Sequence, residues 1–103
     1  MSTERTFEKD VVSEKELIAI AKELAAQLSE SLAQRLLKGR TITLKVKYSD
    51  FQIVTRSQTI GEFTCDSKVI SVYTTALLNK TEAGLRPIRL IGVGMSQLHP
   101  VSG

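Results

Sequence analysis

The sequence predicts an α+β fold, a two-layer sandwich in which two helices cover one face of a four-stranded antiparallel sheet. Three observations favour it. A leucine stripe recurs at helical spacing in residues 13–36, polar and apolar residues alternate in 41–58, and a second capped segment, 65–84, precedes a last alternating run at 88–98. The predicted element order is β-α-β-β-α-β, with the second face of the sheet left in water.

Length and composition are typical of one soluble domain. The chain has 103 residues, of which 42% are hydrophobic and 24% charged. We expect a domain at residues 1–98 and a tail at 99–103, in a piece of a larger protein. No apolar run is long enough to span a membrane and no signal peptide is recognisable, so a cytoplasmic localisation without membrane association is expected.

Charge is unevenly distributed along the chain. Residues 1–37 hold seven acids and five bases, a balance of −2, whereas residues 38–103 hold four acids and nine bases, a balance of +5. The second part therefore suits a polyanionic partner. One cysteine, Cys65, and one histidine, His99, cannot form a disulfide or a cysteine–histidine metal site, so no metal is expected.

The first strand and the first helix have separate signals. Residues 2–8, "STERTFE", predict a short strand. Ser13 and Glu16 match the S-x-x-E capping box that starts a helix, and Gly39 is expected to end it in a left-handed conformation. One apolar stripe of this helix is predicted to form core: Leu17, Ala21, Leu24, Leu28, Leu32 and Leu36.

A hairpin follows the helix. In residues 41–48, "TITLKVKY", apolar residues alternate with Thr and Lys, the period of a half-buried strand. Ser49 and Asp50 predict the turn. In the return strand, residues 51–59, side chains alternate between two sides. Phe51, Ile53, Thr55 and Ser57 point to one side, and Gln52, Val54, Arg56 and Gln58 point to the other.

The segment after the hairpin is ambiguous. Asp66 or Ser67 can cap a helix, yet "VISVYTT" is rich in β-branched residues and passes for a strand. We predict a helix, because a second helix is needed to cover the sheet. The last strand, "IRLIGVGMSQL", alternates bulky residues with Gly92 and Gly94, so one of its faces is nearly bare.

The uncovered face is expected to carry Thr, Lys, Gln and Arg and few acids. One reading is a merely solvated surface, on which lysine also discourages aggregation. The other is a phosphate-binding surface, because phosphates are held by cations, hydroxyls and backbone N–H groups. Aromatic residues are not expected on this face, which argues against stacking of single-stranded bases.

The succession "STERTFEKD", "LKGRTITLKVKYSDFQIVTRSQT" and "RPIRLIGVGMS" resembles the little finger domain of Y-family translesion DNA polymerases, of the DNA polymerase IV and kappa type. The resemblance covers about residues 1–98. It implies a duplex-DNA-binding module whose open sheet enters the major groove of the primer-template. It also implies two protein partners, the palm, finger and thumb core of the same polymerase and the sliding clamp.

The resemblance also implies site residues. Arg56 in "TRS" is the best expected phosphate ligand, with Thr55 beside it. The further expected DNA-binding residues are Thr3, Arg5, Thr43, Lys45, Gln58, Leu90, Gly92, Gly94 and Ser96. Relatives often have a basic residue where this chain has Gly94 and Arg where it has Gln58, which predicts a weaker grip.

Two alternatives stay open beside DNA binding. The first is a protein-interaction module that docks the polymerase on the sliding clamp, by the outer side of the first helix or the tail. The second is a free-standing small enzyme, which the lack of a nucleophile with an adjacent base disfavours. We expect no catalytic residue and no cofactor here, because the magnesium-binding carboxylates of such polymerases belong to their palm domain.

Overall fold

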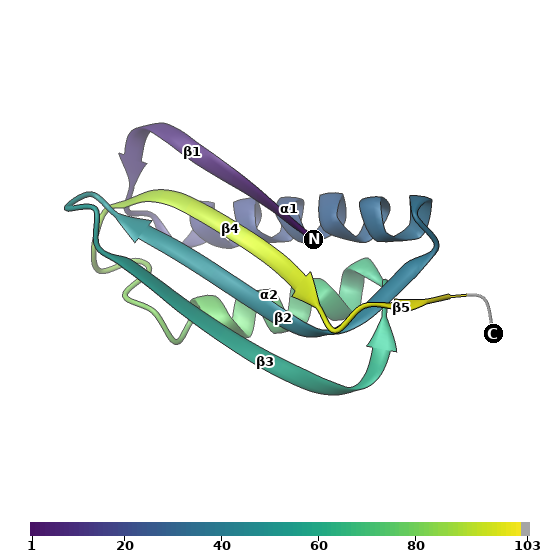
Figure 1. Ribbon diagram of the computed structural model, residues 1–103. Coiled ribbons are helices and arrows are strands. Elements are labelled where there is room, and N and C mark those ends of the chain that lie inside the picture. Colours follow the sequence, from purple (N-terminus) through teal and green to yellow (C-terminus); the bar gives the residue numbers. More distant parts are fainter. Residues whose placement is uncertain (102–103) are drawn as a thin grey trace.

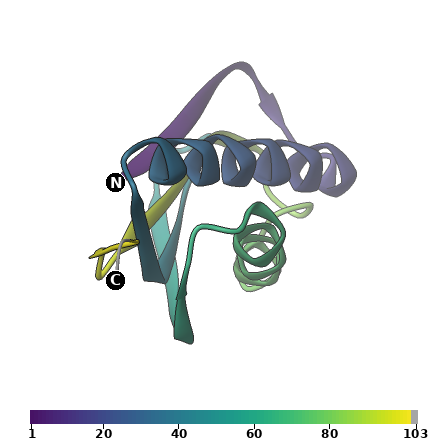
Figure 2. The ribbon, with the colours of Figure 1, turned by 90° about the vertical axis from the view of Figure 1, so that its right-hand side faces the viewer.

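The computed structural model describes residues 1–101 and confirms the two-layer α+β fold. Four long strands, β1 (Ser2–Val11), β4 (Ile88–Ser96), β2 (Leu37–Tyr48) and β3 (Ile53–Thr64), form an antiparallel sheet in that spatial order. Helices α1 (Glu14–Gln34) and α2 (Ser67–Leu78) lie behind the strands in Figure 1. Figure 2 shows both helices on the same side of the sheet, so its other face is uncovered.

The core lies between the helices and one face of the sheet. The alternating apolar residues of β2, Ile42, Leu44, Val46 and Tyr48, are all buried. The β4 residues that pair with them are buried beside them. The helices supply the other side of the core. It consists of four buried leucines and two buried alanines of α1 and the buried residues of α2. From α1, β2 and β4 the core takes Leu17, Ala21, Leu24, Ala25, Leu28, Leu32, Ile42, Leu44, Val46, Tyr48, Ile88, Ile91, Val93 and Met95.

The caps of both helices were predicted correctly. The Ser13 hydroxyl accepts a hydrogen bond from the Glu16 N–H at 3.3 Å, and Asp66 accepts one from the Lys68 N–H at 2.8 Å. The ambiguous segment is helix α2, as expected. Packing of Ile70 and Leu77 into the core outweighs the strand propensity of its β-branched residues.

The predicted end of the first helix was wrong. The helix stops at Gln34, and Leu36, not Gly39, takes the left-handed conformation, with φ 54°. Leu36 is therefore outside the stripe and 65% exposed. Gly39 instead lies inside β2, where a side chain would collide with Met95. The glycine serves close packing, which a sequence pattern does not distinguish from a helix stop.

Several strand limits also differ from the prediction. β1 runs to Val11, β2 begins at Leu37, and β3 extends to Thr64, whereas Phe51 belongs to the turn with φ 70°. β4 ends at Ser96, since Gln97 turns with φ 54°.

The expected tail returns to the sheet. A short strand, β5 (His99–Pro100), pairs with the start of β2, and the Val101 N–H donates to the Leu36 carbonyl at 2.9 Å. The last two residues of the predicted tail, 102–103, lie outside the described residues. In the described part of the chain no helix is long and apolar enough to cross a bilayer.

Candidate nucleic-acid interface

The uncovered face is built by the alternate residues of the four long strands. Thr43 and Lys45 of β2 point away from the helices, since their neighbours on either side are buried beneath them. Their direct partners across the sheet share their face: Gly94 and Gly92 on β4, and Thr55 opposite Lys45 on β3. We call this surface the open face; it is turned toward the viewer in Figure 1.

The open face is hollowed into a groove of about 330 Å³. β4 contributes glycines in its middle, so that the main chain forms part of the floor. Seven of the eleven residues expected to bind DNA line this groove: Thr3, Thr43, Lys45, Thr55, Gly92, Gly94 and Ser96. Leu90 lies farther along the same face, opposite Lys47, and is only 8% exposed.

Two expected site residues of β1 lie on the helix-facing side instead. Thr3 borders the groove, but its hydroxyl contacts Gln27 of α1 at 3.3 Å. Arg5 donates to Glu23 of α1 at 3.0 Å. The register explains this, since both residues pair with buried residues of β4. Their expected role in DNA binding stays a prediction, made from the side of β1 that faces the helices.

The same applies to Arg56 and Gln58. In β3 these residues stand opposite Leu44 and Ile42, so they share the face that the helices cover. Both are nevertheless exposed, because β3 is the edge strand and the helices do not reach these positions. Arg56 donates to the carbonyl of its own neighbour, Thr55, at 2.8 Å.

Glu4 is a charged residue of the groove that the sequence analysis missed. It stands opposite Gly92 of β4, the strand that separates it from Lys45 of β2, and its carboxylate lies 3.6 Å from the lysine Nζ. The side chains of Glu4 and Lys45 meet over Gly92, where a Cβ would lie 3.2 Å from the Glu4 Cβ. The alternation of "STERTFE" puts Glu4 opposite in direction to Thr3 and Arg5, and this signal was available.

An aromatic residue, also unexpected, stands at the hairpin end of the open face. Phe51 is 59% exposed, and the Lys47 Nζ and Arg89 Cζ lie 4.9 and 4.7 Å from its ring centroid. Both distances are within the range of a cation–π contact. Phe51 thus holds two cations at one end of the open face.

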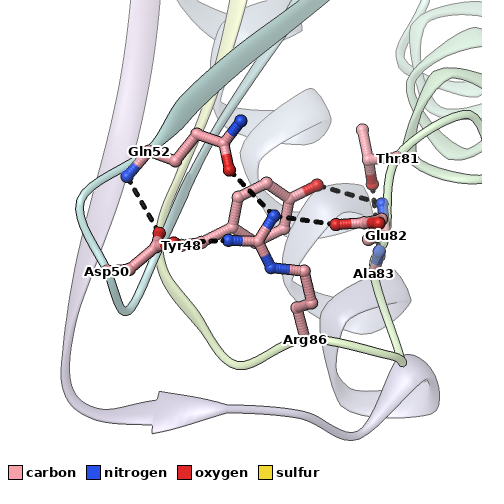
Figure 3. Close-up of polar contacts among 7 residues, drawn as sticks. All are labelled: Tyr48, Asp50, Gln52, Thr81, Glu82, Ala83 and Arg86. Atoms are coloured by element: carbon pink, nitrogen blue, oxygen red, sulfur yellow. Dashed lines mark hydrogen bonds and ion pairs between the residues drawn. The ribbon is translucent and has the colours of Figure 1, made fainter.

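Arg86 contacts the hairpin that carries Phe51, as Figure 3 shows. Its guanidinium contacts Asp50 and Glu82 at 2.8 Å each and Gln52 at 3.0 Å, and it lies 3.9 Å from the centroid of the Tyr48 ring. The hydrogen bond to Glu82 raises the pKa of Arg86, partial loss of hydration opposes the rise, and the charges of Asp50 and Glu82 add to it. These contacts join the turn between β2 and β3 to the loop after α2.

The Tyr48 hydroxyl extends this network by accepting from the Glu82 N–H at 3.0 Å. Within residues 1–101 no three His, Cys, Asp or Glu side chains are grouped so that they could hold a metal ion.

Comparison with known proteins assigns the fold to a family. Residues 1–103 match the model of the impB/mucB/samB family C-terminal domain. The chain belongs to this family. It is 42% identical over 102 residues to DNA polymerase IV of Alkalilimnicola ehrlichii and 41% identical over 98 residues to that of Methanoculleus marisnigri. These matches cover 99% and 95% of this C-terminal domain, but it spans only 28% and 27% of those two relatives.

Solved structures agree with the family. A little finger domain of PolIV, solved in a complex with the beta-clamp processivity factor, matches with a TM-score of 0.74 and 25% identity over 96% of this chain and 88% of that one. A Dbh ternary complex matches with a TM-score of 0.72 and 16% identity over 89% of this chain and 27% of that one, which shows the fold alone. The resemblance to the little finger domain of Y-family polymerases is confirmed.

Proposed function

We propose that this C-terminal domain binds duplex DNA without sequence preference, by holding primer-template phosphates against the open face. The observation that carries the proposal is the groove itself, in which the hydroxyls of Thr43, Thr55 and Ser96 and the Lys45 ammonium surround the partly exposed main chain of Gly94. Hydroxyls, cations and backbone N–H groups are the usual phosphate partners of DNA-binding proteins. The similarity to DNA polymerase IV over nearly the whole chain supports it.

Gly94 gives the groove its second requirement, close approach. It raises no side chain above the sheet and is partly exposed, so a rigid duplex can come near the main chain there, whereas Gly92 is buried beneath the side chains of Glu4 and Lys45. The residues that line the groove include no Arg, Asn or Gln, whose paired hydrogen bonds read the edges of guanine and adenine. Binding governed by phosphates is therefore expected to be tolerant of sequence.

The relatives extend the proposal to a parent protein. They are DNA polymerases IV, and this domain spans about a quarter of their length. We propose that it serves a translesion DNA polymerase in the cytoplasm, joined to a palm, finger and thumb core. Nucleotidyl transfer, with its magnesium ions, would belong to that core, and the domain itself would need no cofactor.

The test is a salt titration of the 103-residue chain with a fluorescent primer-template duplex. Binding should be weak, equal for unrelated sequences, and steeply salt dependent, because each phosphate contact adds about 0.9 to the slope of log affinity against log salt. Chemical-shift changes should gather at Thr43, Lys45 and Gly94. Changes confined to α1 and α2, or an affinity that does not vary with salt, would contradict the proposal.

A second candidate function is docking on the sliding clamp. It is favoured by the similar little finger domain whose structure was solved in complex with the beta-clamp processivity factor. Purified clamp should then retain this chain on a column, and added duplex should leave the retention unchanged if clamp and DNA use different surfaces. No retention at micromolar protein would remove this candidate.

A further inference from the structure

The groove contains an internal competitor for phosphate. Glu4 comes from β1 and Lys45 from β2, and neither is a neighbour of the other in sequence or in strand order. Gly92 of β4, which lies between those strands, pairs with both residues. Because glycine has no side chain, the carboxylate and the ammonium reach across it to 3.6 Å.

The pair lies on the exposed surface of the face. The side chains of Glu4 and Lys45 are 54% and 41% exposed, so water and salt screen their attraction and the pair can open at small cost. Lys45 is the single cationic side chain among the residues that line the groove, where Met1 adds its N-terminal ammonium, and Glu4 is the single carboxylate there. A phosphate that approaches Lys45 therefore meets an equal negative charge beside it.

We infer that Glu4 is the affinity-limiting residue of the groove, and that it acts through Lys45. With the pair closed, the lysine ammonium is neutralised by an internal carboxylate, and a DNA phosphate has to displace Glu4 to use it. Phosphate is thereby disfavoured over β1 and β4 and favoured on the side of Thr43 and Thr55. This inference rests on the proposed DNA binding.

The test compares four variants with the wild-type chain on one fluorescent duplex between 50 and 200 mM salt. They are Glu4→Gln, Lys45→Met, the double variant, and the matched control Glu30→Gln. Glu30 is an exposed residue of α1, on the helix layer, so its substitution makes the same change in net charge away from the groove. Urea midpoints of all variants show that each is folded.

Glu4→Gln should bind roughly three- to tenfold more tightly at 50 mM salt, because a freed Lys45 makes a full phosphate contact. Its slope should rise, but by less than the roughly 0.9 of a full contact because the wild-type lysine already contributes a part, so that at most roughly threefold of the gain is lost by 200 mM. Most of the gain should vanish in the Lys45→Met background. Glu30→Gln should change affinity by less than Glu4→Gln.

Three results would overturn the inference. They are a wild-type affinity and slope in Glu4→Gln, the same gain in the presence and absence of Lys45, and an equal gain from Glu30→Gln. In each case the wild-type chain still binds duplex, and the proposed function survives. Absence of duplex binding by the wild type and by Glu4→Gln alike would instead overturn the proposed function, and this inference with it.

Discussion

Neighbouring residues of β2 have different roles, because one face of the strand packs in the core and the other lines the groove. Leu44 is fully buried beneath the helices, whereas Thr43 and Lys45, its immediate neighbours, line the groove. A substitution on one face should change the stability of the fold, and one on the other should change binding. In this strand, adjacent residues therefore affect different properties, stability for one and binding for the next.

The edge strand β3 lacks this division. Its alternation is the same, but the helices stop short of it, and both Thr55 and Arg56 are exposed on their separate faces. Exposure along β3 therefore does not reveal which side faces a ligand. The two faces of β2 differ because the helices bury one of them, and alternation alone would not produce this difference.

The largest expected effect lies on the covered face. Leu44→Ala should lower the free energy of unfolding by about 2–5 kcal/mol, because it opens a cavity in the core. Thr43→Ala, on the open face, should change it by no more than about 0.5 kcal/mol. Urea denaturation of both variants checks the pair, and similar losses would mean that the faces are not energetically distinct.

A second prediction compares glycines. Gly39→Ala should cost about 1–3 kcal/mol, because the added methyl group collides with Met95 in the core. Gly94→Ala is the matched control, since its Cβ would lie 3.4 Å from the nearest atoms, an ordinary contact. If Gly39→Ala unfolds at the wild-type urea concentration, Met95 moves aside, and the glycine is not required for packing.

The fold was predictable because its determinants are local and repeated. Helical spacing of leucines, the caps at Ser13 and Asp66, and the alternation in β2 each act within a few residues. Gly39 was misread for the same reason, since its constraint comes from Met95, which is far away in sequence. Local patterns do not report such contacts.

The candidate site was predictable only in its central strand and its glycines. Alternation already separated Glu4 from Arg5, but deciding which side of β1 and of β3 faces the helices required the register between β1 and β4 and between β2 and β3. Shifting the register of a strand by one residue exchanges its two faces. Resemblance supplied residue types, but the pairing decides which of them can act together.

A third prediction asks which face meets the DNA. If phosphates are held by the open face, Lys45→Met should reduce the slope of log affinity against log salt. Because the wild-type lysine is partly neutralised by Glu4, the reduction should be smaller than the roughly 0.9 expected of a free cation. Arg56→Met, on the edge of the other face, removes the same charge and should leave the slope nearly unchanged. A larger reduction for Arg56→Met would return the edge strand to the binding site.

The smallest expected effect concerns Arg5, whose role in DNA binding stays a prediction. Its hydrogen bond to Glu23, and then its charge, hold the pKa of that carboxyl below its ordinary value. A lowered pKa stabilises the fold above the ordinary value of about 4.3, and the contribution is lost as the pH falls through the folded-state pKa. The pair should thus be effective at neutral pH and absent in acid.

The measurement is the urea midpoint of the wild type and of Arg5→Met at pH 7 and near pH 3. Arg5→Met should be slightly less stable at pH 7, by the small amount typical of exposed ion pairs, and the gap should close in acid. Arg35→Met is a suitable control, because Arg35 forms no ion pair in the described part of the chain. A gap that persists in acid would mean that Arg5 joins β1 to α1 by the packing of its aliphatic stem. A loss of salt-dependent DNA binding in Arg5→Met would show that the helix-facing side of β1 also reaches the duplex.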